Sequence, residues 1–206
     1  VLLTSTEQEA LRMKRELTKY FHVKMKLELS QEKTKITDLR KGGIHFLGFV
    51  VKAEKKRKTP DPKTWTEYLV GKPFPDMERL AVKIRNLSNE VRNISLYTLP
   101  NTRAAQIQYV NSIIMGIAQY IRPSICSHAF HAMDRRVNNT ALAVWKKLYP
   151  YSYNQMQVPL RMLSNLPHRH EGYDSKTFAI QIEGHWFGIT NAFITHSKHE
   201  SRPFDQ

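Results

Sequence analysis

The chain has almost no cysteine, since Cys126 is the only one in 206 residues. A framework of disulfides and a cysteine-rich zinc site are therefore both excluded. The scarcity is typical of a protein from a reducing compartment. We expect Cys126 itself to be a small buried residue.

Long apolar runs are missing as well. No stretch approaches the roughly 18 apolar residues of a membrane-spanning helix, so we expect no transmembrane segment. The opening Val1-Leu2-Leu3-Thr4 has no charged residues ahead of its apolar ones, so we expect no signal peptide and a protein that is not secreted. It also lacks an initiator methionine, which we interpret as the mark of a fragment.

Acidic residues are few: 18 Asp and Glu stand against 32 Lys and Arg, and the formal net charge is +14. Such an excess favours a polyanionic partner, either nucleic acid or an anionic membrane surface. We favour nucleic acid, because no basic amphipathic helix with a bulky apolar face stands out. The length predicts one or two domains, and an apolar fraction of 41% is sufficient for a core.

The beginning of the chain predicts a helix followed by a strand. Thr6 followed by Glu9 is a capping-box pattern, and apolar residues recur at helical spacing up to about residue 21. Residues 23–29 then alternate strictly between apolar and charged side chains, which predicts a half-buried strand.

A hairpin and an irregular connector are predicted next. The hairpin joins residues 35–39 to residues 44–52 through Arg40-Lys41-Gly42-Gly43, whose glycines would supply the positive φ angles of a tight turn. After Val51 the chain becomes strongly basic and then carries prolines at 60, 62, 73 and 75. This composition predicts a connector over residues 53–75, with a domain boundary at its start.

Three helices are predicted at residues 76–93, 102–121 and 127–148, with Asp76 as the N-cap of the first. Their short connections predict antiparallel neighbours in a compact bundle. In the tail, residues 178–182 and 186–190 predict a further hairpin. The fold class is therefore α+β and mainly helical.

The stretch Leu29-Ser30-Gln31-Glu32-Lys33-Thr34-Lys35-Ile36 is followed by Gly42-Gly43-Ile44-His45-Phe46-Leu47-Gly48-Phe49. Together they resemble the end of the palm of reverse transcriptases encoded by group II introns. The resemblance implies that Lys33 or Lys35 approaches the departing pyrophosphate. It also implies that Phe46, Leu47, Gly48 and Phe49 form a primer grip, in which Gly48 lets the backbone approach the primer closely. Taken alone, these residues equally fit a charged turn and an ordinary hairpin.

A second resemblance lies further along, in Ile107 to Tyr120, in Phe130-His131-Ala132-Met133-Asp134 and in Val144 to Pro150. These segments are similar to the maturase-specific region, or thumb, of the same intron-encoded proteins. Gly116 and Ala118 would allow close helix packing there. The two resemblances follow the family's order along the chain.

They imply four regions: the end of a palm over 1–52, a basic connector over 53–75, a thumb over 76–150 and a C-terminal extension over 151–206. The family's adjacent catalytic Asp residues are absent from this chain. We therefore expect no catalytic residue and no polymerase activity of this chain alone, with Mg²⁺ needed only in a complete parent enzyme. The implied location is a bacterial cytoplasm or an organelle.

The implied partners are structured intron RNA, an RNA/DNA template–primer and the missing fingers–palm part, and no membrane. Folded RNA is recognised largely by its shape and backbone, which requires cations spread at phosphate spacing. The alternative for any one lysine is a solvated charged surface. The cations that we predict to bind RNA are Lys52, Lys55, Lys56, Arg57, Lys58, Arg79, Lys83, Arg85, Arg92, Lys146 and Lys147.

Other side chains have weaker patterns. The aromatic residues Trp65, Tyr68, Tyr149, Tyr151 and Tyr153 lie near cations and are candidates to stack on unpaired bases, with packing as the alternative. The C-terminal histidines lack a compact set of ligands, so no metal site is predicted; they are His168, His170, His185, His196 and His199. Two other functions remain open, a small basic DNA-binding protein and a degenerate splicing cofactor.

Overall fold

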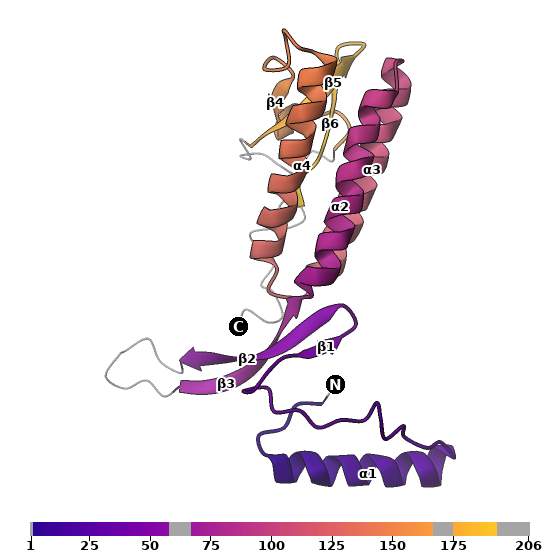
Figure 1. Cartoon of the computed structure of the whole chain (residues 1–206), viewed down its shortest axis with the longest axis vertical. Helices are drawn as coiled ribbons and strands as arrows, with labels where there is room; N and C mark the ends of the chain where they lie inside the picture. The colour runs from indigo at the N-terminus through magenta and orange to yellow at the C-terminus, as the bar shows by residue number, and fades with distance from the viewer. Residues whose placement is uncertain (1, 58–66, 167–174, 193–206) are drawn as a thin grey trace. The chain divides into compact units, whose positions relative to one another are not determined.

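The computed structural model describes residues 2–57, 67–166 and 175–192. The chain divides into two compact units, Val1–Phe74 and Pro75–Gln206, and each is described by itself. The described residues form four α-helices and two small antiparallel sheets of three strands each (Figure 1). The predicted α+β class is thus confirmed.

The first unit begins with helix α1, Glu7–Met25. The predicted capping box is present: the Glu9 amide donates to Thr6 Oγ1 at 3.2 Å, and the Ser5 amide donates to Glu9 Oε2 at 3.1 Å. Lys26 caps the end of the helix; its φ of 55° is left-handed and its amide donates to the Phe21 carbonyl.

The predicted strand at 23–29 is therefore wrong. Residues 23–25 belong to α1, and residues 26–29 form no strand. Alternation predicts a strand only where a partner strand supplies the backbone hydrogen bonds, and no neighbour does so here. The helix keeps its own hydrogen bonds up to the Lys26 cap.

The first sheet has the order β1, β2, β3, formed by Ile44–Phe46, Phe49–Arg57 and Glu67–Pro75. β1 and β2 are antiparallel, with Phe46 opposite Phe49. The two residues between them, Leu47 and Gly48, have φ angles of 48° and 79°. Positive φ at both positions is the geometry of a type I′ hairpin turn.

Two predictions for this region are corrected. The hairpin turn lies at Leu47-Gly48 and not at 40–43, residues 35–39 form no strand, and neither Gly42 nor Gly43 has a positive φ. The connector predicted over 53–75 is instead strand at both ends, and an ion pair joins Glu54 of β2 to Lys72 of β3. The basic and proline-rich composition of this segment favoured an irregular connector, so the sequence did not predict these strands.

The second unit contains helices α2, α3 and α4, formed by Met77–Asn93, Pro100–Ile121 and Ser127–Leu148, with a 3₁₀ turn, η1, at Ile94–Leu96. The three predicted helices are confirmed within two residues. Asp76 caps α2 as expected, since its Oδ1 accepts from the Glu78 and Arg79 amides at 3.2 Å each. Helix α2 packs against both α3 and α4.

The second sheet has the order β4, β5, β6, formed by Gln157–Pro159, Lys176–Ile182 and His185–Gly188, and a second 3₁₀ turn, η2, lies at Leu160–Met162. The predicted C-terminal hairpin is β5–β6, and Glu183 and Gly184 form its turn with φ angles of 50° and 82°. The sheet packs on α3 and α4.

The core of the second unit lies between its helices and this sheet. Phe130, Trp145 and Ile107 are among its fully buried side chains, and Cys126 is buried as predicted. The Trp145 indole donates to the Ala179 carbonyl at 2.9 Å, and Asn111 of α3 bonds both the Gly188 carbonyl and the Thr190 amide. These bonds attach the sheet to the helices.

Gly116 does not have the role that we predicted. It is exposed, and no other described segment lies within 4 Å of the place where a Cβ would be, so it makes no close contact with another of the described helices. Ala118, two residues later, is fully buried.

Candidate nucleic-acid interface

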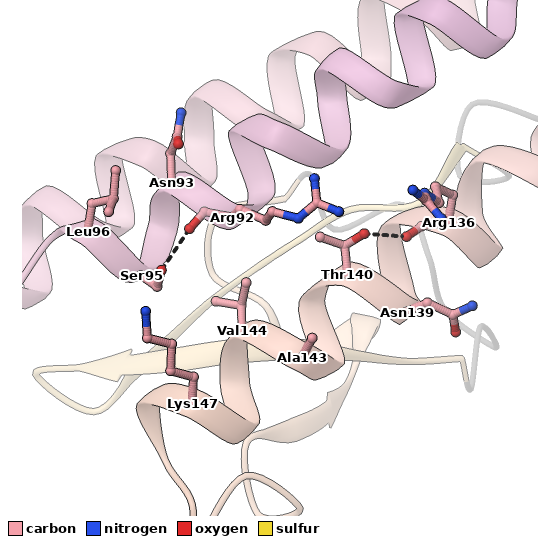
Figure 2. Close-up of a pocket in the computed structure, with 10 residues that line it drawn as sticks. All are labelled: Arg92, Asn93, Ser95, Leu96, Arg136, Asn139, Thr140, Ala143, Val144 and Lys147. Atoms are coloured by element: carbon pink, nitrogen blue, oxygen red, sulfur yellow. Dashed lines mark hydrogen bonds between the residues drawn. The ribbon is translucent and has the colours of Figure 1, made fainter.

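An open hollow of about 510 Å³ lies where the C-terminal end of α2 meets α4 (Figure 2). We call it the α2–α4 groove. Residues of α2 and η1 line one side, and residues spaced three and four apart along α4 line the other. Its members are Arg92, Asn93, Ser95, Leu96, Arg136, Asn139, Thr140, Ala143, Val144 and Lys147.

The lining is cationic on both sides. Arg92 comes from α2, and Arg136 and Lys147 come from α4, while no Asp or Glu lines the groove. Arg136 and Lys147 are eleven residues apart, which is three helical turns, so both lie on one face of α4 about 16 Å apart along its axis. Like charges along a concave surface concentrate a positive potential that attracts polyanions.

The groove has a small and mostly uncharged floor. Thr140 and Val144 are buried, and the Thr140 hydroxyl donates to the Arg136 carbonyl at 2.9 Å. The Ser95 hydroxyl likewise donates to the Arg92 carbonyl at 2.9 Å. Both hydroxyl protons are thus used inside the helices, and the cationic side chains are the strong donors to any bound anion.

Only two of the predicted RNA-binding residues, Arg92 and Lys147, line this groove. Arg136 was missed, although its three-turn spacing from Lys147 was available in the sequence. A sequence pattern shows that two cations share a helix face, but it does not show which neighbouring helix completes the groove.

The other predicted cations of the second unit are placed elsewhere. The Lys83 ammonium lies 4.8 Å from the ring centre of Tyr120, and the Arg79 Nε lies 3.5 Å from Asp76. The Lys146 ammonium lies 5.3 Å from the Tyr153 ring. Arg85 is exposed on α2 but does not line the groove.

The predicted RNA-binding cations that are described in the first unit lie on β2. Lys52 and Lys55 are exposed there, and Lys56 and Arg57 complete the strand. Lys58 and Trp65 lie outside the described residues, as does the side chain of Tyr68.

The residues assigned to the palm by resemblance occupy turns. Lys33 and Lys35 are exposed at a turn in which the Thr34 amide donates to the Ser30 carbonyl at 2.9 Å. The segment predicted as a primer grip is the β1–β2 turn, in which Leu47 is 71% exposed. Phe46 and Phe49 flank the turn as the last residue of β1 and the first of β2, and Gly48 is its second residue, with a positive φ.

Tyrosines gather beyond the C-terminal end of α4. Tyr151 is completely exposed, whereas the Tyr149 hydroxyl accepts from Arg103 Nη1 at 2.9 Å. Tyr153 is half-buried and faces Lys146. Among these three, only Tyr151 presents a ring that is open enough to stack on a base.

The described part of the chain contains no group of three His, Cys, Asp or Glu side chains that could hold a metal ion. His185 is exposed, and its Nδ1 lies 3.4 Å from the Ser164 hydroxyl, while His168, His170, His196 and His199 lie outside the described residues. Within the same described ranges, no helix has the length and apolarity required to cross a bilayer.

Comparison of this chain with protein-family models, with curated proteins and with solved structures finds no match in any of the three.

Proposed function

We propose that this chain binds structured RNA through the α2–α4 groove, as the RNA-gripping part of a group II intron reverse transcriptase and maturase. In that role it assists splicing of the intron RNA and holds the template–primer, while catalysis belongs to parts that this chain does not contain. The observation that carries the proposal is a groove with three cations and no carboxylate on a chain of net charge +14.

The chemistry of the groove supports contact with the backbone of a nucleic acid. Cations bind phosphate oxygens without regard to sequence, and folded RNA is recognised mainly by its shape and backbone. The family resemblance of residues 29–49 and 107–150 favours RNA over DNA as the nucleic acid.

The test is a salt titration of RNA binding by the full chain. We expect R92Q/R136Q/K147Q to reduce the log–log salt slope by about 2 to 3 units, because each phosphate contact contributes about 0.7–0.9. Stability should hardly change, since exposed charges contribute little to it. The matched control R135Q/R161Q/K176Q removes the same charge from exposed positions outside the groove and should reduce the slope much less.

A structured intron RNA and a DNA duplex of equal length separate the alternatives. Preference for the RNA supports the proposal, whereas equal or tighter binding to the duplex indicates a basic DNA-binding protein. If the two triple variants reduce the salt slope equally, the α2–α4 groove is not the surface that binds the RNA.

A further inference from the structure

A second hollow, of about 550 Å³, lies along helix α1 in the first unit. We call it the α1 groove. Six of its members come from α1, and the last comes from the turn that follows the helix. They are Leu11, Lys14, Arg15, Thr18, Lys19, His22 and Gln31.

Helix periodicity builds one side of this groove, because members spaced three and four apart share one helix face. A hydrogen bond holds the other side in place. The Lys14 ammonium donates to the Thr34 carbonyl at 2.9 Å, which ties the turn to α1. The Thr18 hydroxyl donates to the Lys14 carbonyl at 2.8 Å and so points back into the helix.

The α1 groove is cationic for the same reason as the α2–α4 groove. Lys14, Arg15 and Lys19 line it, and no carboxylate does. Glu16 lies on another face of α1, where its Oε1 is 3.7 Å from Arg12 Nε. Lys33 and Lys35 flank Thr34, so the turn adds two exposed cations beside the groove, and the exposed Glu32 offsets one of them.

We propose that the α1 groove is a second phosphate-binding site for the RNA that the α2–α4 groove binds. The inference rests on the proposed function and extends it to cations that no family resemblance assigns. A membrane surface fits the groove less well, because Leu11 is its only apolar member and interfacial helices bury a broad apolar face.

Two sites on one chain act together on a long polymer. Once one groove holds the RNA, the other meets it at a raised effective concentration, so the two sets of contacts add in the free energy of binding. The salt slope should therefore contain separate contributions from both grooves.

The first measurement is the salt slope of R15Q/K19Q in the full chain with the same structured RNA. We expect a decrease of about 1.4 to 1.8 units, since two phosphate contacts are lost. The matched control K24Q/K26Q removes two exposed cations near the C-terminal end of the same helix, outside the groove, and should leave the slope nearly unchanged. Combining R15Q/K19Q with R92Q/R136Q/K147Q should give the sum of the two decreases.

The second measurement reports contact directly. Cys126 is buried, and Thr18 is exposed. The variant T18C therefore introduces an accessible thiol that a maleimide fluorophore can label. We expect RNA to change the emission of the probe with the same midpoint as overall binding. A probe at Q8C, outside the α1 groove, is the comparison.

The outcomes separate the inference from the proposed function. If the wild type binds RNA but R15Q/K19Q keeps its slope and the T18C probe is silent, the second site is refuted and the proposed function stands. If R15Q/K19Q instead loses only its binding to phosphatidylserine vesicles, the α1 groove is a membrane site and the inference is overturned. If the wild type binds no RNA, both proposals fail together.

Discussion

At the scale of single residues, Asp38 and Arg40 form a bidentate ion pair in the first unit. Arg40 Nε lies 2.8 Å from Asp38 Oδ1, and Arg40 Nη2 lies 2.9 Å from Asp38 Oδ2. The Arg40 amide also donates to Oδ1 at 3.0 Å. The hydrogen bonds from the Arg40 side chain contribute most, and the bond from the Arg40 backbone amide contributes next. Together they lower the pKa of Asp38 from 3.8 to about 2.

This pair predicts a titration. A lowered pKa in the folded state means that the interaction is present above pH 3.8 and is lost as the pH falls towards 2. We expect R40Q to return the pKa of Asp38 only part of the way to its ordinary value, because the amide of residue 40 still donates to Oδ1; the carboxyl carbon shift in NMR measures it. R12Q removes an arginine that does not contribute to this shift and should leave that pKa in place. An ordinary pKa in the wild type would contradict the pairing.

The sequence predicted that a group of cations faces a polyanion, but it did not predict which lysines and arginines line a groove. Composition and charge indicate that many lysines and arginines face a polyanion, and the structure places two of the predicted ones in the α2–α4 groove. Arg136 and the cations of the α1 groove were missed, because the hollow beside each depends on a packed neighbour that a local pattern does not reveal. Helix periodicity predicts which cations share one face of a helix, but it does not predict which neighbouring element completes the groove.

At the scale of elements, the two hairpins show what a turn requires. Leu47-Gly48 and Glu183-Gly184 both have positive φ at two successive residues. The sequence located the second turn, because Gly184 stands alone between two strand-like runs. It misplaced the first, since Gly42-Gly43 looks more suitable than a turn that holds leucine in the left-handed region, where bulky residues are uncommon.

The β5–β6 turn predicts two opposite changes in stability. Gly184 has a φ of 82° and open space where a Cβ would be, so G184A should cost about 1 kcal/mol of unfolding free energy through backbone strain alone. E183N should raise that free energy by up to about 1 kcal/mol, because asparagine tolerates a positive φ better than glutamate does. Urea denaturation measures both.

Gly116 provides the control for these variants. It lies in the helix α3 with nothing near its missing Cβ, so G116A should increase stability by about 0.5–1 kcal/mol. A loss of stability in both alanine variants would show that backbone conformation is not what distinguishes the two glycines.

Element type was easier to predict than element pairing. The helices of the second unit carry strong apolar periodicity and clear end signals, so their bounds were close to correct. The alternation at residues 23–29 and the proline-rich strand Glu67–Pro75 misled the prediction, because a strand depends on its hydrogen-bonded neighbour more than on its own pattern.

At the scale of the whole molecule, the two units differ in what they bury. None of the side chains described at residues 2–55 and 69–74 is fully buried, whereas the second unit surrounds a core that includes Leu87, Phe130 and Trp145. Local stability follows the burial of apolar side chains.

This difference in burial predicts the order in which the two units open and exchange their amide hydrogens. In hydrogen exchange measured by mass spectrometry, amides of α1, β1 and β2 should exchange early, and those of α2, α3 and α4 should exchange late. Saturating RNA should slow exchange in α1 if the α1 groove is occupied. Equal protection of the two units in the free protein would contradict this ordering.

The α2–α4 groove lies beside the C-terminal ends of two helices, since α2 ends at Asn93 and α4 at Leu148. The aligned peptide dipoles place about half a negative charge at each end, which partly offsets the three cations and leaves a net of about +2. A lone phosphate ion gains little from so moderate a field. A long polymer presents one charge after another to both grooves, so the protein should select anions by their length, and free nucleotides should compete poorly for the surface that holds RNA.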